Sequence, residues 1–213
     1  MSTVAILAAG EYPRKEFPRY LLASADHLVC CDSALRTALA HGLAPEAVIG
    51  DMDSLPASVL RRFSGNAVKV EEQDDNDLTK AFRYVLETYP DVDAVHILGA
   101  TGKSEAHTLG NMSLLMEYEA TFHASERGIS VDMVSDYSTI FAVCNSCSLQ
   151  VGEGRKVSII SPDNSLRIKS KGLHWKTDDV VFDLWWRATL NRADTDAISL
   201  EFSHPSLALV VLD

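Results

Sequence analysis

The sequence predicts an α/β domain with a mostly parallel sheet, followed by an all-β sandwich. Between residues 3 and 120, short apolar runs alternate with polar turns and with segments of helical period. That order is typical of parallel strands joined by crossover helices. Past about residue 125, short strand-like runs are separated by turn residues roughly every eight to twelve positions, which is typical of a sandwich. We place the domains at residues 1–125 and 131–213.

Composition limits the class of protein. The chain has 213 residues, of which 46% are hydrophobic and 23% charged, so we expect a globular protein with its own cores. A formal net charge of −11 argues against a nucleic-acid partner, because such a surface needs clustered Lys and Arg. No apolar run has the length of a membrane span, and no basic segment precedes the first apolar run. We therefore expect a cytoplasmic protein without a membrane partner.

Three continuous apolar runs predict the first buried strands, at residues 3–9, 27–31 and 47–49. Each ends in a polar turn, and helices are expected at 18–24 and 34–41. Cys30 and Cys31 lie in the second run, where we expect them to be small buried residues.

The third run ends in Gly50-Asp51-Met52-Asp53. In an extended chain the side chains of Asp51 and Asp53 point to the same face, so both can bind one cation. Mg²⁺ prefers such carboxylates together with phosphate oxygens. The alternative is a plain turn in which aspartates hydrogen-bond to the backbone.

Residues 71–77 hold five acids in seven positions, directly before a predicted helix at 77–89. Asp75 or Asn76 can cap this helix, whose apolar residues fall on one stripe. The helix dipole explains one or two of the acids but not five. A second carboxylate group here would complete a metal site with Asp51 and Asp53, and Lys80 could reach a phosphate from it.

A glycine turn, Gly99-Ala100-Thr101-Gly102-Lys103-Ser104, follows a predicted strand at 94–98 and precedes a helix at 108–120. It lacks the spacing of a nucleotide P-loop, although its backbone N–H groups can still face a phosphate. Because parallel strands end at one edge of a sheet, the polar turns should share one rim. These turns contain Asp32, Asp51, Asp53, residues 73–77 and residues 99–107.

The second domain is expected to consist of short strands only. Cys144 and Cys147 form a C-x-x-C pair without the further ligands of a zinc site, so we interpret them as structural. Trp175 and the pair Trp185-Trp186 lie near turns; they are typical of a core, although a flat cationic ligand would suit an aromatic face. The expected strands are 130–135, 137–143, 146–151, 156–161, 165–170, 180–183, 197–202 and 207–212.

Taken in order, these motifs resemble thiamine pyrophosphokinase, and the resemblance spans nearly the whole chain. The matching segments are Cys31-Asp32-Ser33-Ala34, Ile49-Gly50-Asp51-Met52-Asp53-Ser54, residues 73–81, Gly99 to Gly102 with His107-Thr108-Leu109, Gly172-Leu173-His174-Trp175, Thr189-Leu190-Asn191 and His204-Pro205.

The resemblance implies transfer of a pyrophosphoryl group from ATP to the hydroxyethyl oxygen of thiamine, with release of AMP. It also implies a homodimer whose active sites lie between the subunits. Mg²⁺ would be bound by Asp51, Asp53 and Asp77, and Asp74 or Asp77 would accept the alcohol proton. The nucleotide and its phosphates would contact Asp32, Gln73, Lys80, Thr101, Gly102, Lys103 and His107. Thiamine would contact Trp175, Thr189 and Asn191.

Two departures from the family pattern leave a second hypothesis open. Ser104 stands where the family has an arginine, and Ala106 stands where it has an aspartate. Lys103 could replace the charge of that arginine but not its planar fork. The alternative to a working enzyme is therefore a catalytically weak or inactive homologue that binds thiamine or a nucleotide. A nucleotide-sugar transferase, which also uses an Asp-x-Asp metal motif, is a more distant alternative.

Overall fold

The computed structural model describes residues 2–72 and 74–213 and divides into two compact units. The first unit holds the residues up to 114 together with 125–136, and the second holds 115–124 together with 137–213. The predicted fold class is confirmed, since a parallel sheet with helices precedes a region built of antiparallel strands. Among the residues that the structure describes, none of the helices combines the length and the apolar character needed to span a bilayer.

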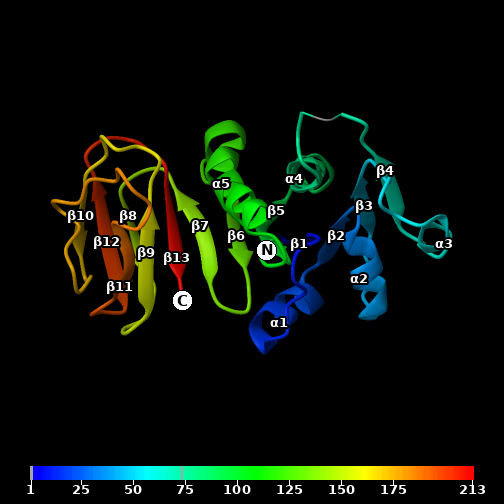
Figure 1. Ribbon diagram of the computed structural model, residues 1–213, viewed down its shortest axis with the longest axis horizontal. Coiled ribbons are helices and arrows are strands. Elements are labelled where there is room, and N and C mark those ends of the chain that lie inside the picture. The colour runs from blue at the N-terminus through cyan, green and yellow to red at the C-terminus, as the bar shows by residue number, and fades with distance from the viewer. Residues whose placement is uncertain (1, 73) are drawn as a thin grey trace. The chain divides into compact units, whose positions relative to one another are not determined.

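The first unit contains a parallel sheet in the order β6-β5-β1-β2-β3-β4 (Figure 1). The central strands carry runs of buried apolar side chains, as expected for strands that are covered on both faces. The strands are β1 (Ser2–Leu7), β2 (His27–Cys31), β3 (Ala47–Gly50), β4 (Asn66–Lys69), β5 (Val92–Leu98) and β6 (Ser130–Val134).

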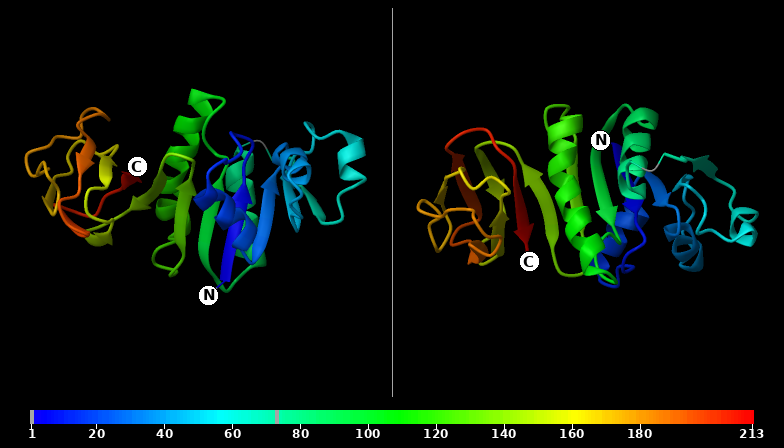
Figure 2. Two further views of the ribbon diagram at one scale, coloured as in Figure 1. Left: turned by 90° about the horizontal axis from the view of Figure 1, so that it is seen from below. Right: turned by 45° about the horizontal axis from the view of Figure 1, so that its top comes forward.

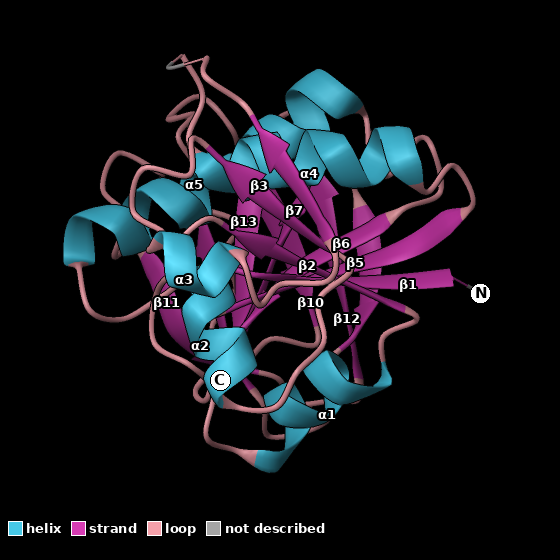
Figure 3. Cartoon of the chain, turned by 90° about the vertical axis from the view of Figure 1, so that its right-hand side faces the viewer, coloured by secondary structure: helices cyan, strands magenta, loops and turns pink. Residues whose placement is uncertain are grey.

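Helices lie on both faces of this sheet. Figure 3 shows α4 on one side of the strands and α1 and α2 on the other. The predicted stripe of α4 is confirmed, because its apolar residues from Leu78 to Leu86 are buried. The helices are α1 (Glu16–Ser24), α2 (Ala34–Ala40), α3 (Ala57–Leu60), α4 (Asp77–Thr88) and α5 (Glu105–Phe122).

One strand has a pairing that was not predicted. The run at 130–135 was expected in the sandwich, but β6 pairs in parallel with β5, from Ala94 opposite Ser130 to Leu98 opposite Val134. The strand is buried only at its carboxyl end, so its sequence lacks the continuous apolar character of the inner strands. The sequence of such a short run does not show which strand it pairs with.

The second unit is built from two antiparallel sheets, in the orders β11-β9-β13-β7 and β10-β12-β8. Both contribute side chains to one apolar core, which includes Ile159 and Val210 from the first sheet and Ile168 and Leu200 from the second. Figure 2 shows these strands in yellow to red. They are β7 (Thr139–Val143), β8 (Cys147–Gln150), β9 (Lys156–Ile160), β10 (Ile168–Lys171), β11 (Ala188–Arg192), β12 (Ala197–Phe202) and β13 (Ala208–Leu212).

One strand expected in this unit does not form, and one strand that does form was not predicted. Residues 180–183 form a turn and no strand, and the strand in this part of the sandwich is β11. The apolar run at 180–183 has another cause, since Phe182 is buried in the core while its neighbour Val181 is exposed. A loop that inserts one aromatic ring into a core therefore resembles a short strand in sequence.

Candidate functional site

A cavity of about 390 Å³ opens in the first unit where the strand order reverses. The chain runs from β1 outward through β2, β3 and β4, and then returns to place β5 on the other side of β1. Ligands of open α/β sheets bind at such a switch point, beyond the carboxyl ends of the strands. The lining residues come from the loops after β1, β2 and β5 and from the first turns of α4 and α5. They are Ala8, Ala9, Gly10, Cys31, Ser33, Asn76, Asp77, Leu78, Ala100, Gly102, Lys103, Ser104, His107 and Asn111.

Two of these loops are joined by hydrogen bonds. Gly10 N donates to Gly99 O at 2.6 Å, and Glu11 N donates to Thr101 O at 2.8 Å. A Cβ added to Gly10 would lie 2.4 Å from Gly99 O, so the close approach of the two loops requires glycine there. The loop after β1 and the glycine turn after β5 therefore form one wall of the cavity.

Asp32 follows β2 and is held against the end of β3. Its backbone N donates to Ile49 O at 2.8 Å, and Ser54 Oγ donates to its Oδ2. Its other oxygen, Oδ1, is buried and has no hydrogen-bond partner among the described residues. A buried carboxylate oxygen of this kind is costly unless a ligand or a cation supplies the missing interaction.

Asp77 begins α4, and Asn76 caps that helix by accepting a hydrogen bond from Thr79 N at 2.9 Å. Of the two predicted caps, Asn76 is the one observed. Burial raises the pKa of Asp77, Lys80 opposes the rise, and the charges of Asp32 and Asp51 add to it. Three carboxylates from three separate segments therefore repel one another at this edge of the sheet.

This group of carboxylates fits a hard divalent cation. A positive ion would relieve the repulsion and give Asp32 Oδ1 a partner, and carboxylate oxygens are the donors that Mg²⁺ prefers. Within residues 2–72 and 74–213, no three Asp, Glu, His or Cys side chains are gathered into a ready ligand cage. The carboxylates interact through space, and a cation would have to draw them together.

Asp53 is exposed, and its backbone N donates to Asp51 Oδ1 at 3.1 Å. That bond is the one expected of the plain-turn alternative, and Met52 between them adopts a left-handed φ of 67°. The assignment of Asp51 and Asp53 to Mg²⁺ stays a prediction. Asp74 is exposed, and the predicted phosphate ligand Gln73 lies outside the described residues.

Lys80 does not face the solvent, although it was predicted to contact phosphate. Its side chain is 3% exposed, with Nζ 3.8 Å from Asp77 Oδ1 and 3.5 Å from Val70 O. This position allows Lys80 to neutralise Asp77 from within the protein.

The N-terminus of α5 completes the cavity. Ser104 Oγ accepts a hydrogen bond from His107 N at 3.3 Å, which explains why α5 starts at Glu105, earlier than predicted. Lys103 has a left-handed φ of 62°, and its Nζ donates to Ala9 O at 2.8 Å. Ala106 is exposed and carries no polar group. Three residues predicted to contact the nucleotide, Gly102, Lys103 and His107, line the cavity. Thr101 is not among the lining residues, and its carbonyl oxygen accepts the hydrogen bond from Glu11 N.

Asn111 was not identified from the sequence. It lines the cavity, and its Nδ2 donates to Ala100 O at 2.8 Å. Its spacing of four residues from His107 places both on one helix face, which is the only sequence signal for it.

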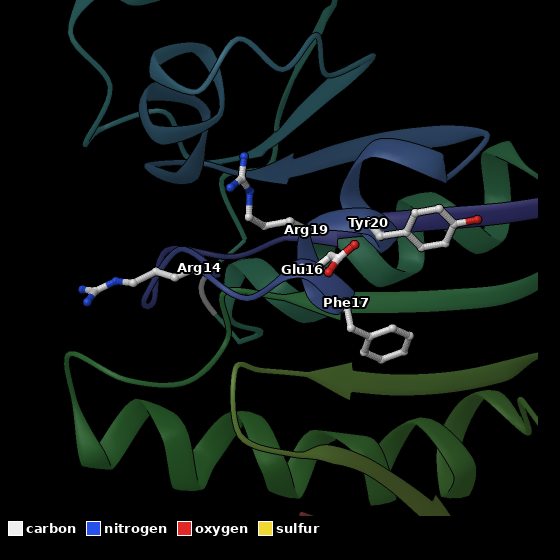
Figure 4. Close-up of a pocket in the computed structure, with 5 residues that line it drawn as sticks. All are labelled: Arg14, Glu16, Phe17, Arg19 and Tyr20. Carbon is white, nitrogen blue, oxygen red and sulfur yellow. The ribbon is translucent and has the colours of Figure 1, made fainter.

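A larger hollow, of about 680 Å³, lies over α1. Figure 4 shows its lining side chains pointing in different directions, with no set of polar groups that converges on one point. Arg14, one of its two arginines, is paired with Glu11 at 2.8 Å. The residues that line this hollow therefore do not form a binding site for a particular ligand. Its lining residues are Arg14, Glu16, Phe17, Arg19 and Tyr20.

In the second unit, Asn191 and Trp175 are tied together. Trp175 N donates to Asn191 Oδ1 at 3.1 Å, and Asn191 Nδ2 donates to Trp175 O at 2.6 Å. Asn191 is buried, while the Trp175 side chain is 59% exposed. Thr189 donates its Oγ1 to Trp186 O at 2.8 Å. Asn191 therefore fixes the backbone that presents Trp175 to solvent.

Comparison with protein families adds to this geometry. Residues 18–125 match the model of the thiamin pyrophosphokinase catalytic domain, and residues 139–207 match that of the thiamin pyrophosphokinase substrate-binding domain. The chain belongs to the thiamine pyrophosphokinase family. Thiamine pyrophosphokinase of Bacillus subtilis (strain 168) is 33% identical over 121 residues, a match that spans 54% of this chain and about half, 55%, of that relative.

Solved structures of thiamine pyrophosphokinases share the fold. The Bacillus subtilis structure superposes with a TM-score of 0.77 at 19% identity, covering 100% of this chain and 99% of that one. A family member from Enterococcus faecalis gives 0.79 at 20% identity, with coverage of 100% and 99%. The yeast structure gives 0.75 at 15% identity, with coverage of 100% and 86%. At this level of identity the likeness supports the fold of the family and no further detail.

Proposed function

We propose that this member of the thiamine pyrophosphokinase family transfers a pyrophosphoryl group from ATP to the hydroxyethyl oxygen of thiamine, giving thiamine diphosphate and AMP. The observation that carries the proposal is the buried Oδ1 of Asp32, which has no partner among the residues that the structure describes and lies near Asp51 and Asp77. Carboxylates left in this state suit a cation that arrives with a polyphosphate. The glycine turn after β5 lines the cavity that Asp77 also lines, and such a turn can present backbone N–H groups to a phosphate.

Asp51, Asp53 and Asp77 would hold Mg²⁺, with Asp32 beside them, and the bound ion would supply positive charge against the phosphate oxygens. Lys80 partly balances the charge of Asp77 from inside the protein and opposes the rise in the pKa of that carboxyl group. We propose that Asp77 or Asp74 accepts the proton of the thiamine hydroxyl group. Burial raises the pKa of Asp77, so this carboxylate is suited to accept a proton when it is not bound to metal.

The thiamine side of the reaction is assigned to the second unit. The exposed ring of Trp175 offers an aromatic face for the positively charged thiazolium ring, and Asn191 holds the backbone of Trp175 in place. Thr189 lies on the same strand, β11. We further propose a homodimer with active sites at the subunit interface, and the expected cytoplasmic location stays a prediction.

The decisive measurement is AMP formation from ATP, with thiamine and Mg²⁺ each omitted in turn. We expect AMP only when both are present, and we expect Asp51→Asn to slow the reaction about 100-fold or more, since it removes a charge from the reacting centre. Asp91→Asn is the matched control, because Asp91 is exposed and precedes β5 at the opposite end of the strand. Unchanged turnover in Asp51→Asn would remove this residue from the site.

The alternative, a homologue that binds without turnover, rests on Ser104 and Ala106. In the structure Ser104 only caps α5 and Ala106 carries no charge, so neither replaces the family arginine or aspartate. Saturable binding of thiamine or nucleotide without AMP would support this alternative. The double variant Ser104→Arg/Ala106→Asp would then be expected to gain activity, while a double variant that is no faster would show that the two positions are not limiting.

A further inference from the structure

The rim that would receive the polyphosphate of ATP carries an excess of negative charge. Glu71, Glu72, Asp74 and Asp75 precede α4 in sequence, close to Asp77. Glu72 Oε1 accepts a hydrogen bond from Asp75 N at 2.7 Å, and its buried Oε2 has no partner among the described residues. Arg83 is paired with Asp75. One divalent ion does not balance the other carboxylates together with a triphosphate, so further positive side chains that can move would favour binding.

Two of the lysines near the cavity already contact other groups of the protein. Lys80 is buried and directed at Asp77 and Val70 O. Lys103 donates to Ala9 O and thereby ties the glycine turn to the loop after β1. Moving either ammonium to a phosphate would break a contact that shapes the site.

Lys69 is differently placed. It is the last residue of β4 and pairs in register with Gly50, the residue directly before Asp51. Its Nζ lies 2.7 Å from Glu71 Oε1, and the two side chains are 56% and 78% exposed. The hydrogen bond to Glu71 and the charges of Glu71, Asp53 and Asp51 raise the pKa of Lys69. Lys69 is therefore a charged side chain within electrostatic reach of the Asp51-Met52-Asp53 turn.

An exposed ion pair of this kind is easily exchanged. Water screens the attraction between Lys69 and Glu71, and both side chains lose conformational freedom while they are paired. The terminal phosphate group of ATP carries about −1.5 to −2 charges on three acceptor oxygens, which is more than the carboxylate it would replace. Release of Lys69 from Glu71 therefore costs little when a polyphosphate arrives.

We propose that Lys69 is a further phosphate-binding residue of this protein, which leaves Glu71 and contacts a phosphate oxygen of ATP at the β3–β4 edge of the site. The inference deepens the proposed function and rests on it for the identity of the nucleotide. It gives β4, which carries none of the family motifs, a part in substrate binding. In the absence of ATP, Lys69 then pairs with Glu71. When ATP binds, Glu71 competes with the phosphate for Lys69.

The test measures binding of a non-hydrolysable ATP analogue with Mg²⁺ by calorimetry, and the KM for ATP where turnover is present. Lys69→Gln should weaken both by about tenfold, the usual worth of a charge-assisted hydrogen bond, with little change in kcat. Lys69→Arg should restore affinity to within about twofold, because arginine keeps the charge and the donors. Glu71→Gln should increase the affinity for the ATP analogue, since it removes the carboxylate that competes for Lys69.

Arg62→Gln is the matched control, because it removes one exposed positive charge from the same unit without lying at the rim. Affinity of Lys69→Gln within twofold of wild type, or an equal loss in Arg62→Gln, would overturn the assignment. The KM for thiamine should not change in any of these variants. If wild type binds the analogue but forms no AMP, the proposed function fails while the binding comparison still decides the role of Lys69.

Discussion

Gly50 shows how a single missing side chain shapes the site. A Cβ at this position would lie 2.6 Å from the Cβ of Asp32, closer than side-chain carbons approach in folded proteins. The bare backbone of Gly50 thus allows the end of β3 to lie directly beside the carboxylate that follows β2. The position of Asp32, and with it the unpartnered Oδ1, depends on this contact.

Gly50→Ala should therefore damage both stability and activity. We expect the free energy of unfolding to fall by about 1–3 kcal/mol, as for other substitutions that overfill a packed site, and AMP formation to slow as Asp32 is displaced. Denaturant unfolding and the AMP assay measure the two effects.

Gly110→Ala is the control for that experiment. Gly110 lies inside α5, and an added Cβ there would meet nothing within 4 Å. Alanine should raise the free energy of unfolding by roughly 0.5–1 kcal/mol, because it favours the helical backbone. Equal stability losses in the two variants would contradict the packing argument at Gly50.

At the scale of elements, His96 and Asp132 link β5 to β6. They are opposite each other in the parallel register, and His96 Nδ1 lies 2.8 Å from Asp132 Oδ1. The hydrogen bond to Asp132 raises the pKa of His96, and partial burial opposes the rise. Because the folded pKa lies above the unfolded value, the pair adds stability below the unfolded pKa of about 6.5 and loses it as pH rises through the folded pKa.

We expect the free energy of unfolding to decline between about pH 6 and pH 8 in wild type, and this part of the decline to be absent in Asp132→Asn. At pH 6 the substitution should cost about 1–2 kcal/mol, the usual worth of a hydrogen bond to a charged group. Urea unfolding across this pH range measures it, with His123→Gln as a variant that keeps the pair. A pH dependence that survives in Asp132→Asn would have to come from other groups.

The elements that the sequence predicts correctly are those specified by local signals. The apolar stripe of α4 and its cap at Asn76 follow from periodicity and side-chain chemistry within a few residues. The sequence did not predict the parallel pairing of β6 with β5 or the strand β11, because both depend on partners far away in the chain. Apolar character at 180–183 reflected one buried ring, Phe182.

The candidate site shows the same limit. Parallel strands place their following residues at one edge, so Asp32, Asp51 and Asp77 were predicted to share a rim, and the structure brings them within electrostatic range. The direction of a side chain was not predictable: Lys80 turned out to be buried and Asp53 exposed. The direction of these side chains depends on tertiary packing, which cannot be inferred from the spacing of residues along the chain.

At the scale of the whole molecule, several large apolar side chains of the second unit are exposed between residues 175 and 190. A solvated surface seldom keeps so many large apolar groups, so their exposure supports the proposed dimer. They are Trp175, Val181, Leu184, Trp185, Trp186 and Leu190.

In solution we expect light scattering to give twice the chain mass of 23.3 kDa. Trp185→Ser/Trp186→Ser should shift the protein toward monomer and reduce AMP formation, because the active sites would lie between subunits. Tyr20→Ser, at an exposed aromatic residue of the first unit, is the control and should leave the mass unchanged. A monomeric wild type with full activity would rule out the dimer as a requirement.

The strand order of the first unit also determines when the site can form during synthesis. β1 receives one neighbour early, from β2, but its other neighbour is β5, whose last residue is Leu98. Until about 98 residues have left the ribosome, one edge of β1 has no partner, and the cavity lacks its wall after β5. If the protein binds a nucleotide as proposed, binding becomes possible only after this long-range pairing and would report on a late event in folding.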